Sequence, residues 1–89
     1  MTTFESRGLE IRNFCKSLVL DFMNASGECQ STSTGMKQSQ IFKNCGLDWG
    51  TYPSVTSSNQ QYWILAILSE LKKEGKVVRI ADSGPWRLC

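Results

Sequence analysis

The side chains that most often catalyse reactions or bind metals are scarce in this 89-residue sequence, and their spacing suits neither role. The sequence has no histidine, which removes the commonest general base, the Ser-His and Cys-His nucleophile pairs and every histidine-containing zinc site. Successive cysteines are 14, 16 and 44 residues apart, so no pair has the close spacing of a zinc knuckle. We therefore expect no metal, no cofactor and four reduced thiols, at Cys15, Cys29, Cys45 and Cys89.

One pair of carboxylates has a spacing that could serve catalysis. Glu70 and Glu74 lie one helical turn apart, but Lys72 and Lys73 lie between them, so the pattern is typical of an exposed helix face. The sequence also has no glycine-rich phosphate-binding loop. We expect a protein without catalytic activity and without a small-molecule substrate.

An uncharged polar run precedes the apolar segment that begins at Tyr62; its residues are Ser57, Ser58, Asn59, Gln60 and Gln61. Serine followed three residues later by glutamine is a capping-box pattern, which by itself predicts only the start of a helix. Asparagine and glutamine can also pair with adenine edges, and serine can bond bases or phosphate. A helix start favours acidic residues, and their absence suits an end that faces phosphates. Both interpretations remain open.

Positive charge increases along the chain. The first thirty residues carry three basic and four acidic side chains, whereas residues 61–89 carry five basic and three acidic ones. Lys37 and Lys43 flank an expected second helix, and Lys76, Arg79 and Arg87 belong to the C-terminal segment. The formal net charge of +2 is too small to indicate nucleic-acid binding by itself.

The spacing of apolar residues predicts three helices, over residues 5–24, 36–45 and 57–74, followed by a hairpin with strands at 77–80 and 85–88. Residues 28–35 are expected to form a polar loop with almost nothing to bury. Residues 48–56 form a connection that contains Trp49, Tyr52 and Val55. Gly75, between the third helix and the hairpin, should have a positive φ.

The first helix has an apolar stripe that predicts one buried face, with positions at i, i+3, i+4, i+7 and i+11: Ile11, Phe14, Cys15, Leu18 and Phe22. Leu9, Val19 and Met23 widen this stripe. We expect Trp63 and Trp86 to be mostly buried, in one core with Phe14, Leu18 and Leu68.

This order of elements predicts a single α+β domain over residues 1–89, mainly α. A three-helix core would carry a C-terminal β-hairpin at residues 76–88, as in a winged helix-turn-helix, where the hairpin is called the wing. Because an isolated two-stranded hairpin is marginally stable, we expect Trp86, Ile80 and Val78 to pack on the helices. We also expect a third short strand from around residues 35–36. No run of about 18 apolar residues and no signal peptide is present, so we expect a cytoplasmic protein.

The C-terminal third also resembles a known family. The residues that carry the resemblance are Trp63, Leu65, Ala66, Leu68, Leu71, Glu74, Gly75, Val77 and Arg79, followed by Gly84-Pro85-Trp86-Arg87-Leu88. This pattern is similar to the N-terminal DNA-binding domain of Mrr-type restriction enzymes. The resemblance implies a prokaryotic or phage DNA-binding module, either a small regulator of transcription or the DNA-targeting part of a restriction or repair system. The expected wing tip departs from the pattern, because it carries Asp82 rather than a basic cluster.

Two functions follow from this interpretation. In the first, duplex DNA is bound through residues of the third helix start, the second helix and the wing: Lys37, Lys43, Ser57, Ser58, Asn59, Gln60, Arg79 and Arg87. In the second, the module contacts a protein partner or a second copy of itself through Trp49, Tyr52 and Val55. Convergence of the four cations on the face that carries Asn59 and Gln60 would favour DNA. Scattered cations would favour protein contact.

Overall fold

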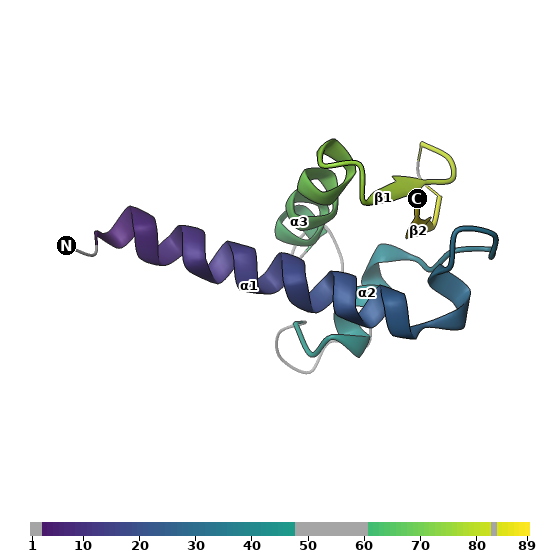
Figure 1. Ribbon diagram of the computed structural model, residues 1–89, viewed down its shortest axis with the longest axis horizontal. Coiled ribbons are helices and arrows are strands. Elements are labelled where there is room, and N and C mark those ends of the chain that lie inside the picture. The colour runs from purple at the N-terminus through teal and green to yellow at the C-terminus, as the bar shows by residue number, and fades with distance from the viewer. Residues whose placement is uncertain (1–2, 48–60, 83) are drawn as a thin grey trace.

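A computed structural model describes residues 3–47, 61–82 and 84–89, which form three α-helices and a small antiparallel sheet (Figure 1). The helices are α1 (Phe4–Ala25), α2 (Gln38–Asn44) and α3 (Gln61–Lys73), with a short 3-10 helix (Gly27–Cys29) after α1. The strands are β1 (Val77–Arg79) and β2 (Trp86–Leu88). The mainly helical α+β class is confirmed. None of the described helices is long and apolar enough to cross a membrane.

The N-terminus of α1 is closed by a capping box in which two side chains satisfy each other's backbone amides. The Ser6 amide donates to Thr3 Oγ1 and the Thr3 amide donates to Ser6 Oγ, both at 3.0 Å. The helix then runs past the rest of the protein, so that its first turns extend beyond the other described elements (Figure 1). Its buried residues, Val19 and Met23, both lie in the second half.

The core lies where α2, α3 and the hairpin meet the second half of α1. Its buried hydrophobic residues are Val19, Met23, Cys29, Met36, Ile41, Phe42, Ile67, Leu68, Leu71, Val77 and Trp86. Trp63 is half-buried and packs edge-to-face on Phe42, with ring centroids 4.8 Å apart. The predicted burial of Trp86 and Leu68 is confirmed, whereas Val78 and Ile80, which were expected to pack on the helices, are 37% and 43% exposed.

The predicted buried face of α1 is confirmed only in part: Val19 and Met23 are buried, whereas three residues of the central stripe are exposed. Ile11, Phe14 and Leu18 are 65%, 77% and 41% exposed, and Phe14 and Leu18 do not belong to the core. At about 100° per residue, Phe14 points about 140° away from Val19 around the helix axis. The described core lies on the side of α1 that carries Val19 and Met23, and no described element covers the side that carries Phe14.

The turn from α3 into the hairpin has the geometry that the sequence predicts. Gly75 has a φ of +75°, its amide donates to the Lys72 carbonyl, and the Lys76 amide donates to the Leu71 carbonyl, each at 3.0 Å. These two bonds form a Schellman motif, which satisfies the last carbonyls of the helix. The chain leaves α3 directly into β1, which pairs with β2 in the register Val77↔Leu88, Val78↔Arg87 and Arg79↔Trp86.

The expected third strand is present as a single antiparallel bridge between Met36 and Trp86. The Met36 amide donates to the Trp86 carbonyl at 2.9 Å, and the Trp86 amide donates to the Met36 carbonyl at 2.8 Å. Because β2 also pairs with β1, it lies between β1 and Met36. Gly35 permits this approach: its φ is +84°, and a Cβ there would lie 2.9 Å from the Trp86 carbonyl oxygen.

Candidate nucleic-acid interface

The residues expected to read DNA bases, Ser57, Ser58, Asn59 and Gln60, lie outside the described residues. So does the expected protein-contact group of Trp49, Tyr52 and Val55. Among the predicted DNA-binding residues, those that the structure describes are the four cations expected to contact phosphates. Lys37 and Lys43 lie at the two ends of α2, and Arg79 and Arg87 lie on the hairpin.

The two lysines of α2 are exposed and directed to solvent. Lys37 is the N-cap residue, and its carbonyl accepts the amides of Gln40 and Ile41 at 3.0 Å. Lys43 lies in the last turn, where a positive charge suits the negative end of the helix dipole. Neither lysine forms an ion pair with a described residue. Both ammonium groups are available to an anionic ligand.

Arg79 is engaged inside the hairpin. Its Nε donates to the Gly84 carbonyl at 3.0 Å, across the turn that joins β1 to β2. Its guanidinium also lies 5.1 Å from the centroid of the Trp86 ring, a cation–π distance. The side chain is half-buried. Arg79 therefore holds the two strands and their turn together.

Arg87 is engaged on the other face of the hairpin. It pairs with Val78, one position along from the Arg79↔Trp86 pair, and side chains alternate between the faces of a strand. Its Nη1 donates to the Ser33 carbonyl at 2.8 Å, so it attaches the loop after α1 to β2. The two arginines do not form one positive patch.

The loop after α1 makes more contacts with the rest of the protein than its polar sequence suggests. Cys29 is completely buried, which contradicts the expectation that residues 28–35 have almost nothing to bury. Gln30 Nε2 donates to the carbonyls of Met23 and Ser26, at 3.2 and 2.8 Å, and so satisfies acceptors at the end of α1. A glutamine side chain closes this helix end.

All four cysteines are free thiols, as expected. Burial raises the pKa of Cys45 to about 11 and also raises the pKa of Cys29. Both groups are therefore protonated at neutral pH, and a protonated thiol is a poor nucleophile.

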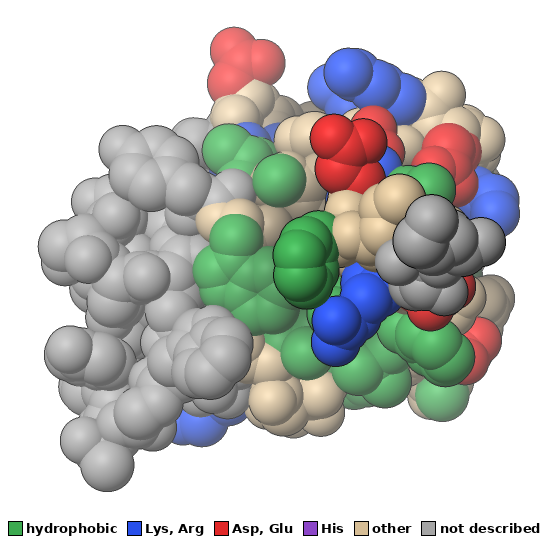
Figure 2. Space-filling model, turned by 90° about the vertical axis from the view of Figure 1, so that its left-hand side faces the viewer, with side chains coloured by type: hydrophobic (Ala, Val, Ile, Leu, Met, Phe, Trp, Pro, Cys, Tyr) green, Lys and Arg blue, Asp and Glu red, His purple; other side chains and the backbone are tan. Residues whose placement is uncertain are grey.

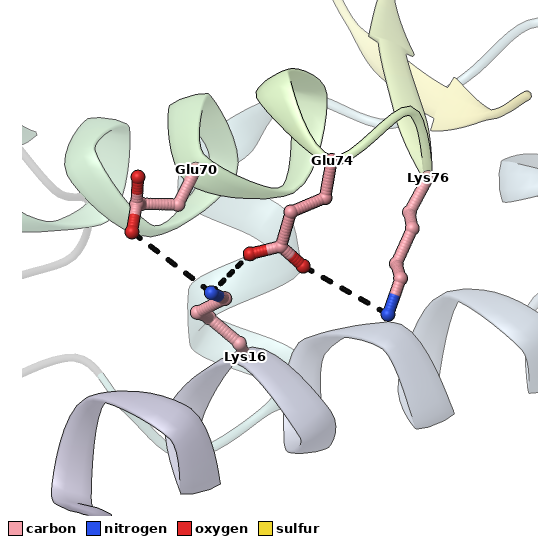
Figure 3. Close-up of polar contacts among 4 residues, drawn as sticks. All are labelled: Lys16, Glu70, Glu74 and Lys76. Carbon is pink, nitrogen blue, oxygen red and sulfur yellow. Dashed lines mark hydrogen bonds and ion pairs between the residues drawn. The ribbon is translucent and has the colours of Figure 1, made fainter. Parts of the chain in front are cut away.

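A cluster of ion pairs joins α1 to α3, and sequence analysis did not find it. Lys16 contacts both Glu74 and Glu70, the latter at 3.9 Å, and Lys76 lies 3.8 Å from Glu74 (Figure 3). The hydrogen bond from Lys16 is the main cause that lowers the pKa of Glu74. The spacing of Glu70 and Glu74 was visible in the sequence, but their partner is 58 residues from Glu74 on another helix.

Sequence analysis also missed an exposed apolar surface on α1. Phe4, Ile11, Phe14 and Leu18 are 41–87% exposed. Viewed from the end of the molecule where α1 begins, hydrophobic side chains lie at the surface among charged ones (Figure 2). Large apolar side chains grouped at a surface commonly mark an interaction site. The signal was present in the sequence, because apolar residues of this helix lie in more directions than one core can cover.

Comparison with protein-family models, with curated proteins and with solved structures gave no match to this chain. Function therefore has to be inferred from the side chains and contacts described above. These contacts divide the predicted phosphate-binding cations into two exposed lysines and two arginines with structural partners.

Proposed function

We propose that this chain is a winged helix-turn-helix module that binds duplex DNA. The observation that carries the proposal is the bridge between Met36 and Trp86, which makes Met36 an edge partner of β2. The order then becomes helix, short strand, two helices and two strands. In this arrangement α2 and α3 form the helix-turn-helix pair and residues 76–88 form the wing.

In this proposal the residues just before α3 enter the major groove, where Asn59 and Gln60 contact base edges. Lys37 and Lys43 on α2 contact phosphates. Arg79 and Arg87 keep the wing folded, because each already has a partner within the protein. The resemblance to the DNA-binding domain of Mrr-type restriction enzymes supports this assignment, and the motif residue Trp86 serves the core.

The binding should be weak and strongly salt-dependent. Two lysine–phosphate contacts release about two counterions, so log Kd should change with log salt concentration with a slope of about 2 in magnitude. A slope of about 3 to 4 would require both arginines to contact phosphates as well. At physiological salt we expect a Kd in the range of about 10⁻⁴ to 10⁻⁶ M for a monomer.

The test is a fluorescence-anisotropy titration of labelled duplexes at several salt concentrations. Lys37→Gln and Lys43→Gln should each weaken binding to every sequence and reduce the slope by about 1. Lys73→Gln is the matched control, because it removes the same charge at the far end of α3. Asn59→Ala and Gln60→Ala should instead reduce discrimination between sequences. Absence of binding at low salt, where the phosphate contribution is strongest, would refute the proposal.

Protein contact is the second candidate function, and two observations favour it. The arginines of the hairpin lie on opposite faces rather than converging. The exposed apolar side chains of α1 also offer a surface of the kind that proteins bury on association. This function does not exclude the first, since many DNA-binding modules act as dimers.

A further inference from the structure

One side of α1 carries an uninterrupted row of exposed residues at alternating intervals of three and four, which we call the α1 seam. It consists of Phe4, Arg7, Ile11, Phe14, Leu18 and Asp21. The four apolar members are 87%, 65%, 77% and 41% exposed, in chain order. Intervals of three and four residues keep side chains on one stripe of a helix, which is the spacing used for contact between two long helices.

The α1 seam is not the face of α1 that packs against the rest of the protein. Val19 and Met23 are fully buried against the core, and Lys16 forms the ion pairs with α3. These residues point in another direction around the helix axis. No described element covers Phe4, Ile11 or Phe14, each of which is at least 65% exposed.

The charges of the α1 seam indicate what covers it. Arg7 and Asp21 are each seven residues from Phe14, so the seam is basic on one side of its midpoint and acidic on the other. The Arg7 guanidinium lies 5.9 Å from the Phe4 ring centroid, which places it beside the apolar row. Neither Arg7 nor Asp21 forms an ion pair within the described part of the chain.

We propose that the α1 seam binds the α1 seam of a second copy of this chain, with the two helices antiparallel and crossing at Phe14. In this arrangement Arg7 of each copy faces Asp21 of the other, and Ile11 of each copy faces Leu18 of the other. A parallel arrangement would place Arg7 against Arg7 and Asp21 against Asp21, and like charges repel. Both copies contribute the same surface, so the contact is isologous and the assembly is complete with two copies.

The dimer should be weak. A seam along one helix buries less than the roughly 1,600 Å² of a standard interface, so we expect a dissociation constant in the micromolar range. The inference does not depend on DNA binding, and its test contains no DNA. Its failure is therefore distinct from failure of the proposed function.

The first experiment is analytical ultracentrifugation of the full chain across concentrations on both sides of the expected micromolar Kd. Phe14→Glu should weaken association by at least about tenfold, because it places a charge at the midpoint of the seam. Asn13→Glu adds the same charge at the adjacent exposed position, outside the seam, and should leave association unchanged. Circular dichroism should show that both variants keep the wild-type helix content.

The second experiment tests orientation by exchanging charges. Arg7→Glu or Asp21→Arg alone should weaken association, because each creates like charges at both ends of the seam. The double variant, Arg7→Glu with Asp21→Arg, should restore association towards the wild-type Kd. A chain that stays monomeric at all concentrations overturns the proposal. So does association that Phe14→Glu leaves intact, or a double variant that associates no better than the single ones.

Discussion

At Gly75 the backbone has a φ of +75°, and nothing lies within 4 Å of where a Cβ would be placed. The requirement for glycine is therefore conformational rather than steric. A residue with a Cβ is strained in the left-handed region, whereas glycine adopts it freely. The two hydrogen bonds of the turn, to Leu71 and Lys72, fix this conformation and direct the chain from α3 into the wing.

We expect Gly75→Ala to destabilise the protein by about 1 kcal/mol or more, because alanine strains this turn. The matched control is Gly8→Ala, at an open position within α1. Alanine there should stabilise by about 0.5–1 kcal/mol, because glycine weakens a helix interior. Chemical denaturation of both variants measures the difference. Equal effects at the two positions would contradict the role assigned to Gly75.

At the scale of whole elements, one ion-pair cluster connects α1 and α3. Lys16 is the central cation, and its side chain is only 15% exposed. It contacts the carboxylates of Glu70, in α3, and of Glu74, the residue that follows α3 (Figure 3). The second half of α1 therefore has both apolar and charged attachments to the rest of the fold. The exposed first half has no such attachment to a described element.

The pH dependence of stability should reveal this cluster. The pKa of Glu74 is lowered in the folded protein, chiefly by the hydrogen bond from Lys16. The ion pairs of Glu74 therefore contribute to the free energy of unfolding above the ordinary glutamate pKa. This contribution is lost as the pH falls from that value through the lowered pKa. We expect Lys16→Met to reduce the denaturation midpoint near neutral pH, and the difference from wild type to shrink in acid.

The control for this prediction is Lys72→Met, which removes the same charge from an exposed residue of α3. Lys72 forms no ion pair with a described residue, so its effect should be small and nearly independent of pH in the acid range. If Lys16→Met and Lys72→Met changed stability with the same pH profile, the ion pairs of Lys16 would make no measurable contribution to stability. High salt should reduce the Lys16→Met effect, since part of it is screened.

For the molecule as a whole, Trp86 joins three parts of the chain. Its backbone pairs with Met36, its Nε1 donates to Gln38 Oε1 at 3.3 Å, and its ring packs under Arg79. The side chain is 2% exposed. The loop before α2, α2 itself and the wing therefore all contact this residue. We expect these three parts to unfold together in one cooperative transition.

We expect Trp86→Ala to cost about 3–5 kcal/mol, a large share of the stability of a domain of this size. Trp86→Phe keeps much of the apolar contact and loses the hydrogen bond to Gln38, so it should cost less. Thermal unfolding followed by circular dichroism measures both. A Trp86→Ala protein that melts at the wild-type temperature would show that the wing is not part of the cooperative core.

The local structure of this protein follows largely from its sequence. Apolar spacing predicted α1 over residues 5–24 and the hairpin strands near Val77 and Trp86, and the observed bounds differ by a few residues at most. Gly75 predicted the left-handed turn between α3 and β1. These features depend on backbone conformation and on neighbours close in the chain, which a sequence specifies directly.

Only the tertiary structure decided which direction of α1 is buried and which partner each charge has. Both Val19 and Phe14 belong to apolar rows of α1, yet Val19 is buried and Phe14 is exposed. Periodicity gives the rows, whereas burial depends on where α3 and the wing lie. Likewise, Lys16 meets Glu74 and Arg87 meets Ser33 across 58 and 54 residues of sequence. Such contacts form because packing brings distant segments together, and no local pattern encodes that.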